Sequence, residues 1–137
     1  MGGVYFADTF YWIALAHPRD ASRAQVATWT LKNRSARLIT TEEILSELLT
    51  WFAGSGPAGR ANAVTAVRKI LSDPTVQVLP QTTADFHAAF ALYEARLDKD
   101  YSLVHCRSIV ALKALSISEV LTNDHHFTQE GFTVLFP

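Results

Sequence analysis

The sequence predicts an α/β fold with a parallel central sheet of four or five strands that is flanked by helices. Short apolar segments alternate along the chain with longer segments whose apolar residues recur at helical spacing. The short segments are nearly continuous apolar runs, which is typical of parallel strands that helices cover on both faces. A chain of 137 residues has the size of one domain with one core, so we expect a single domain over residues 1–137.

Strands are expected where β-branched, aromatic and aliphatic residues are bounded by turn residues. They cover residues 4–7, 37–40, 76–79 and 120–122, with an edge strand at residues 132–135. The helices between them are expected at residues 9–17, 20–33, 41–52, 57–71, 83–97 and 102–115. Asp8, Thr41 and Ser102 stand at helix starts, where a short polar side chain can cap free backbone N–H groups.

Charge and cysteine content limit the classes of function. The formal net charge is -1, which is not the overall charge of a nucleic-acid binder, although a local basic rim beside an acidic site would suffice. Cys106 is the only cysteine, which excludes an internal disulfide and a cysteine zinc cluster. The absence of a glycine-rich phosphate loop argues against NAD or ATP. The N-terminus lacks the pattern of a signal peptide and no apolar run approaches membrane-span length, so we expect a cytoplasmic protein without membrane contact.

Three acidic residues occupy positions that a parallel sheet brings together. Asp8 follows the first strand, Asp124 follows the fourth, and Glu47 projects from the helix after the second strand, beside an apolar stripe. Ligands of open α/β sheets bind beyond the carboxyl ends of the strands. Clustered carboxylates repel one another unless a cation neutralises them, and oxygen ligands favour Mg²⁺ or Mn²⁺. Each acid also has a structural interpretation: Asp8 as a helix cap, Asp124 as a turn residue and Glu47 as a partly exposed helix residue.

Four segments resemble the motifs of the PIN-domain ribonucleases, specifically the VapC-type toxins. Asp8-Thr9 resembles the first motif, residues 40–48 (TTEEILSEL) the second, residues 101–106 (YSLVHC) the third, and residues 121–127 (LTNDHHF) with Gly131-Phe132 the fourth. The resemblance covers nearly the whole chain.

The resemblance implies a metal-dependent endoribonuclease that is the toxin of a toxin–antitoxin pair. Its catalytic acids would be Asp8, Glu47 and Asp124, which would bind Mg²⁺ or Mn²⁺ together with the position of His105 and with Asp98. It further implies an RNA substrate, with tRNA as one candidate, a small antitoxin as partner, and a homodimer. We expect Thr9, Ser102 and Thr122 to lie next to the metal ligands without binding the metal themselves. Thr9 and Thr122 would hydrogen-bond metal-bound water, and Ser102 would cap a helix.

His105 departs from the family pattern, which has an aspartate at this position. A neutral imidazole supplies one nitrogen and no negative charge, and it suits Zn²⁺ or Mn²⁺ better than Mg²⁺. Three interpretations remain open: Asp98 or Asp100 replaces the missing ligand, the protein has lost nuclease chemistry, or the histidine is an inactivating substitution. His125 and His126 adjoin Asp124, but adjacent residues point in different directions, so we interpret them as a polar loop that Phe127 anchors.

Two alternatives from other functional classes stay open. One is a catalytically silent PIN-like domain that binds RNA or an antitoxin. The other is a receiver-like signalling domain, which also carries acids at strand ends. The sequence gives the second little support, because it has no acidic pair beside the first strand and no lysine at a strand end.

Overall fold

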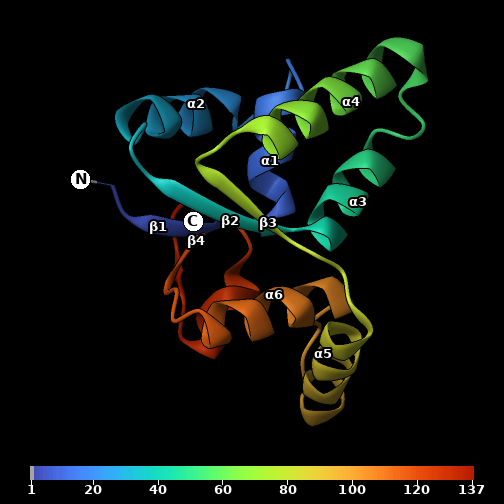
Figure 1. The fold of residues 1–137 in the computed structure, drawn as a ribbon, viewed down its shortest axis with the longest axis vertical. Helices are drawn as coiled ribbons and strands as arrows, with labels where there is room; N and C mark the ends of the chain where they lie inside the picture. Colours follow the sequence, from blue (N-terminus) through green and yellow to red (C-terminus); the bar gives the residue numbers. More distant parts are fainter. Residues whose placement is uncertain (1) are drawn as a thin grey trace.

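A five-stranded, entirely parallel sheet forms the centre of the computed structural model, which describes residues 2–137 (Figure 1). Its strands are β1 (Val4–Ala7), β2 (Arg37–Thr41), β3 (Val76–Leu79), β4 (Glu119–Leu121) and β5 (Thr133–Val134). They lie in the order β3-β2-β1-β4-β5, and every neighbouring pair is parallel. The predicted fold class is therefore confirmed, with β5 as the expected edge strand.

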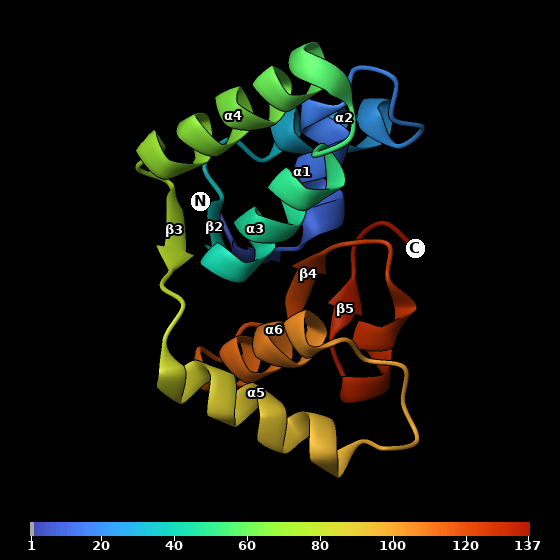
Figure 2. The ribbon, with the colours of Figure 1, turned by 90° about the vertical axis from the view of Figure 1, so that its right-hand side faces the viewer.

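Helices cover both faces of this sheet. One layer holds α1 (Thr9–Ala16), α2 (Arg23–Lys32), α3 (Glu42–Trp51) and α4 (Gly56–Ser72); the other holds α5 (Thr83–Ala95), α6 (Leu103–Ala114) and the 3-10 helix η1 (His125–Glu130). The views in Figures 1 and 2 show the α5 and α6 layer on the opposite side of the strands from α4 and α1. Among the described residues, no helix has both the length and the apolar character that crossing a bilayer requires.

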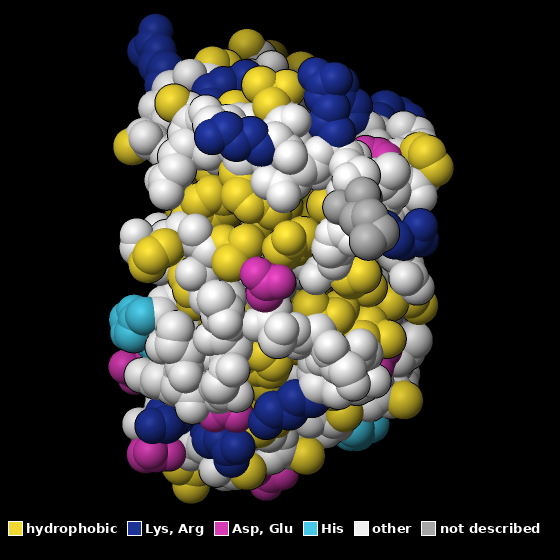
Figure 3. Space-filling model, turned by 90° about the vertical axis from the view of Figure 1, so that its left-hand side faces the viewer, with side chains coloured by type: hydrophobic (Ala, Val, Ile, Leu, Met, Phe, Trp, Pro, Cys, Tyr) yellow, Lys and Arg dark blue, Asp and Glu magenta, His cyan; other side chains and the backbone are white. Residues whose placement is uncertain are grey.

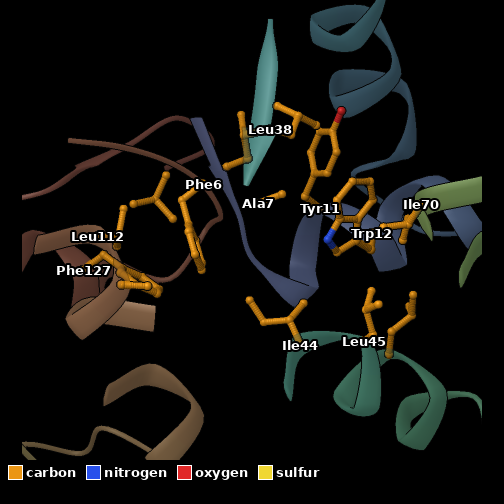
Figure 4. Close-up of a cluster of buried hydrophobic side chains, with 14 of the residues drawn as sticks. Phe6, Ala7, Tyr11, Trp12, Leu38, Ile44, Leu45, Ile70, Leu112 and Phe127 are labelled. Atoms are coloured by element: carbon orange, nitrogen blue, oxygen red, sulfur yellow. The ribbon is translucent and has the colours of Figure 1, made fainter. Parts of the chain in front are cut away.

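The core lies on both sides of β1 (Figure 4). On one side, Phe6 points toward Leu112 of α6 and Phe127 of η1, and all three side chains are buried. On the other side, Tyr11 and Trp12 of α1 fill the space beneath α2, α3 and α4. Burial of such large apolar side chains is the main favourable contribution to folding, so β1 and the start of α1 are held firmly in place.

Polar caps fix the starts of two helices near the carboxyl ends of the strands. The Thr41 hydroxyl accepts a hydrogen bond from the Ile44 N–H (3.1 Å) at the start of α3. At the start of α6, the Ser102 hydroxyl accepts from the His105 N–H (3.0 Å), and Nδ1 of His105 accepts from the Ser102 N–H (3.1 Å). This reciprocal pair is a capping box, in which a histidine replaces the usual glutamate or glutamine.

Two segments differ from the sequence prediction. Helix α2 begins at Arg23 rather than Asp20, because the Asp20 carboxylate accepts from the Ser22 N–H (2.8 Å) and forms a turn. The loop after Asp124 contains η1, which no apolar period predicted, since a short 3-10 helix has too few residues to show one.

Candidate functional site

Asp8 is a buried carboxylate at the carboxyl end of β1. Because Ala7 pairs with Leu121, the residues that follow them, Asp8 and Thr122, lie next to each other. The Thr122 hydroxyl donates to Oδ2 of Asp8 (2.8 Å), and the Asp8 side chain is only 7% exposed. Asp8 is the N-cap residue of α1, but its carboxylate makes no capping hydrogen bond, so the side-chain capping role expected from the sequence is wrong. Burial raises the pKa of Asp8, and the hydroxyl of Thr122 offsets this only in part.

Glu47 is joined to Asp8 through Thr9. The Thr9 hydroxyl donates to Oε1 of Glu47 (2.5 Å), and Thr9 is the residue directly after Asp8. Glu47 is half-buried on α3. Its negative charge contributes to the raised pKa of Asp8, after the larger effect of burial. The predicted acids of the first and second motifs therefore lie close together.

Asp124 lies between two histidines at the carboxyl end of β4. Its Oδ2 is 2.6 Å from Nε2 of His105, and its Oδ1 is 2.9 Å from Nδ1 of His126. Its backbone N–H donates to the Thr122 hydroxyl (3.1 Å), so that Thr122 links Asp124 to Asp8. Burial raises the pKa of Asp124, but the His126 N–H and the two imidazoles outweigh burial, and the net pKa is lowered.

The hydrogen bonds of His105 define the position of its proton. The Ser102 N–H donates to Nδ1, so Nδ1 is an unprotonated acceptor. In the neutral ring the proton therefore resides on Nε2, which points at Asp124. His105 thus donates to the carboxylate at the place where the resemblance implies a second carboxylate.

Two residues considered in the sequence lie apart from this group. The Asp98 side chain is 75% exposed, and Lys99 is its ion-pair partner at 3.5 Å. No hydrogen bond or ion pair within residues 2–137 joins Asp98 to Asp8, Glu47 or Asp124. His125 is exposed, whereas Phe127 is buried as expected. A ligand role for Asp98 therefore remains a prediction.

Two charged or polar contacts were not expected from the sequence. His126 was treated only as part of a loop, yet η1 turns it toward Asp124. Arg107 is buried on α6, where Nε donates to Glu43 (2.9 Å), and its guanidinium also contacts the Pro80 carbonyl and Asp85. The signal for Arg107 was present, because it is a charge within the otherwise apolar or small segment 106–112.

A groove of about 540 Å³ adjoins Glu47 on the α3 side. Its lining includes Thr9, Glu47, Gln81 and Trp51, and the Trp51 side chain is 50% exposed. By contrast, Arg37 begins β2 and so lies at the amino ends of the strands. Figure 3 shows that opposite face, where lysine and arginine side chains are scattered among apolar ones.

The arrangement fits a divalent cation. Nδ1 of His126 is shielded from solvent and has no hydrogen-bond partner among residues 2–137, although it lies 2.9 Å from an oxygen of Asp124. A buried polar atom without a partner is uncommon. One donor atom from each of His105, Asp124 and His126 lies within 4.8 Å of the others, and the carboxylates of Asp8 and Glu47 add negative charge beside them.

Comparison with solved structures identifies the fold. The VapC20 toxin of Mycobacterium tuberculosis, described as a sarcin-ricin loop cleaving toxin, superposes with a TM-score of 0.82 over 98% of this chain and 99% of its own, at 24% identity. The chain has a PIN-domain fold. The PIN fold also matches VapBC2 from Rickettsia felis, whose structure holds a promoter DNA fragment (TM-score 0.60, 13% identity, 96% of each chain). FitAcB from Neisseria gonorrhoeae gives a TM-score of 0.63 at 16% identity over 96% of this chain and 95% of its own. No protein-family model and no curated protein matches the sequence.

Proposed function

We propose that this chain is a metal-dependent endoribonuclease that acts as the toxin of a toxin–antitoxin pair in the cytoplasm. One observation carries the proposal. Within a PIN fold, Thr9 follows Asp8 and its hydroxyl binds Glu47, while the Thr122 hydroxyl binds the Asp8 carboxylate and the Asp124 N–H. The three acids that the family motifs require are therefore held close together.

In this mechanism Asp8, Glu47 and Asp124 would hold the cation. A bound divalent cation polarises a phosphodiester and lowers the pKa of water for hydrolysis. Thr9 orients the Glu47 carboxylate and Thr122 orients that of Asp8, so each acid presents a fixed oxygen. Trp51 offers an exposed ring beside Glu47 on which an unpaired base can stack.

The test is cleavage of defined RNA in the presence of Mg²⁺ or Mn²⁺. Suitable substrates are a tRNA and the sarcin-ricin loop oligonucleotide, the latter chosen because the M. tuberculosis neighbour cleaves that loop. Asp8→Asn should reduce cleavage by about 100-fold or more, because a metal ligand is lost. Glu94→Gln, an exposed change on α5, should leave cleavage unaltered. Metal-independent cleavage, or equal cleavage by Asp8→Asn, would refute the proposal.

A catalytically silent PIN-like domain is the second candidate. It is favoured by the direct contact of His105 with Asp124, where the resemblance implies two acids around a cation. Such a domain would bind the same RNA without cutting it, whichever of Mg²⁺, Mn²⁺ or Zn²⁺ is supplied. RNA binding by gel shift, with no product from any of these ions, would decide for the silent domain.

Two exposed surfaces support the proposed partners. Helix α5 carries Phe86, Phe90 and Tyr93 at intervals of four and three residues, and all three are exposed. This spacing of about 3.5 residues suits pairing with the same stripe of a second copy.

A separate hollow of about 430 Å³ in the α1, α2 and α4 layer combines Trp12 and Ile70 with Arg23 and Lys69. It suits an antitoxin segment with apolar and acidic residues.

Each partner has its own test. Phe90→Glu should convert a dimer to a monomer in light-scattering chromatography, whereas Leu31→Glu, an exposed change on α2, should not. Coexpression with the product of an adjacent small open reading frame tests the antitoxin, and Lys69→Glu should weaken that complex. A monomeric native chain, or an unaltered complex, would contradict the respective surface.

A further inference from the structure

We propose that His105, Asp124 and His126 form a nitrogen-rich site that binds a transition-metal ion of the Zn²⁺ class in preference to Mg²⁺. The inference deepens the proposed function, since it concerns the cation of the same site. Metal binding is measurable whether or not RNA is cleaved, so the two proposals can fail separately.

The positions of the donor atoms are the first argument. His105 and His126 approach different oxygens of one carboxylate, at 2.6 and 2.9 Å. Ligands of one ion with bonds of about 2.0–2.2 Å lie roughly 3 Å or slightly more apart. Small side-chain rotations would therefore allow all three groups to surround one ion, with no change in the backbone.

The second argument is the unsatisfied nitrogen of His126. Its Nδ1 is shielded from solvent, and no hydrogen-bond partner is found for it within residues 2–137. The His126 N–H already donates to the same Oδ1 of Asp124 (2.9 Å), which fixes the ring of His126 beside the carboxylate. A cation bound to both Nδ1 and Asp124 would replace this 2.9 Å contact, which does not have the geometry of a hydrogen bond.

Ser102 allows His105 to change from hydrogen-bond donor to metal ligand. Coordination through Nε2 requires the ring proton to reside on Nδ1 instead. The Ser102 hydroxyl lies 3.1 Å from Nδ1 and can accept that proton's hydrogen bond. The Ser102 N–H, which then loses Nδ1 as acceptor, belongs to an exposed residue that water reaches. A metal-bound histidine commonly has such an acceptor on its other nitrogen.

The donor set decides the preference between ions. Two neutral imidazoles and one carboxylate favour Zn²⁺, and to a lesser degree Mn²⁺, over Mg²⁺, which prefers oxygen and gives up its water reluctantly. The carboxylate of Asp8 lies close enough to His105 for the two charges to interact, so it adds attraction for a cation. His125 is exposed and takes no part.

The experiment is isothermal titration calorimetry of the full chain with ZnCl₂, MnCl₂ and MgCl₂. We expect one Zn²⁺ per chain, weaker Mn²⁺ binding, and Mg²⁺ binding weaker than that of Zn²⁺ by a factor of about 100 or more. His126→Ala should lower Zn²⁺ affinity about 10–100-fold and leave Mg²⁺ affinity unchanged. His125→Ala is the matched control and should alter neither.

Other outcomes would overturn the inference. These are Mg²⁺ affinity equal to that of Zn²⁺, or Zn²⁺ affinity that is lost with His125 rather than His126. If His126→Ala does not fold, NMR of the native chain decides: the ring signals of His105 and His126 must shift together with one equivalent of Zn²⁺. Zn²⁺ binding without RNA cleavage would refute the proposed function alone, whereas Mg²⁺-driven cleavage without Zn²⁺ binding would refute the metal preference alone.

Discussion

The hydroxyl of Thr122 donates a 2.8 Å hydrogen bond to the carboxylate of Asp8, although the two residues are 114 positions apart. The same hydroxyl accepts a hydrogen bond from the backbone N–H of Asp124. One small side chain thus connects the ends of two adjacent parallel strands and fixes two acids of the candidate site.

Replacing Thr122 by valine removes this hydroxyl and keeps the shape of the side chain. Asp8 then loses its buried donor, and the Asp124 N–H loses its acceptor. We expect the free energy of unfolding at pH 7 to fall by about 1–3 kcal/mol, measured by urea denaturation. Thr133→Val on the exposed edge strand β5 is the control. A similar loss of unfolding free energy in both variants would show that the Thr122 hydrogen bonds stabilise the fold no more than an exposed threonine does.

Asp8→Asn should make the protein more stable at neutral pH. Burial raises the folded-state pKa of Asp8 above its unfolded value, so the folded state binds the proton more tightly. The associated stability is present below the unfolded pKa and is lost as the pH rises through the folded pKa. The variant should therefore gain stability relative to the native chain between pH 4 and pH 8, as followed by thermal melts. A difference that is constant with pH would contradict the raised pKa.

Arg107 and Glu43 should behave as a coupled buried pair. The Arg107 side chain is 5% exposed, that of Glu43 is 17% exposed, and Nε lies 2.9 Å from Oε2. Arg107→Leu leaves the Glu43 charge unpaired and should cost about 3–5 kcal/mol of unfolding free energy, whereas Arg107→Leu with Glu43→Leu should recover most of it. Urea denaturation of the native chain, both single variants and the double variant gives the coupling energy. Additive losses would show that the contact carries no coupling.

His105→Asp should increase Mg²⁺-dependent RNA cleavage, by about 10–100-fold. The change restores the carboxylate of the family motif and removes the imidazole that donates to Asp124. Single-turnover cleavage at several Mg²⁺ concentrations measures the effect. If cleavage is unchanged while Asp8→Asn abolishes it, His105 does not limit the reaction.

Most of the fold could be predicted because each strand and helix has a recognisable pattern in its own local sequence. The apolar segments 4–7, 37–40, 76–79 and 120–122 all proved to be parallel strands, and the predicted helices differ mainly at their ends. The start of α2 was wrong because Asp20 can form a turn as readily as it can cap a helix. The 3-10 helix η1 was missed because six residues carry no measurable period.

The proximity of Asp8 and Asp124 was predictable because the sheet positions both residues. Asp8 and Asp124 follow strands, and parallel strands end at the same edge of the sheet, so their proximity followed from topology. The direction in which His126 points depends on the turn of η1, which the sequence does not show. The partner of Arg107 lies 64 residues away on α3, and no local pattern encodes such a distant contact.

The pairing of β1 with β4 also has a consequence for protein synthesis. Asp8 leaves the ribosome well before Thr122, which follows it by 114 positions, and domains fold as their residues emerge. A nascent chain that has not yet reached Asp124 therefore cannot assemble the group of acids around Asp8. Under the proposed function, such a nascent toxin cannot cleave the RNA of the ribosome that is synthesising it.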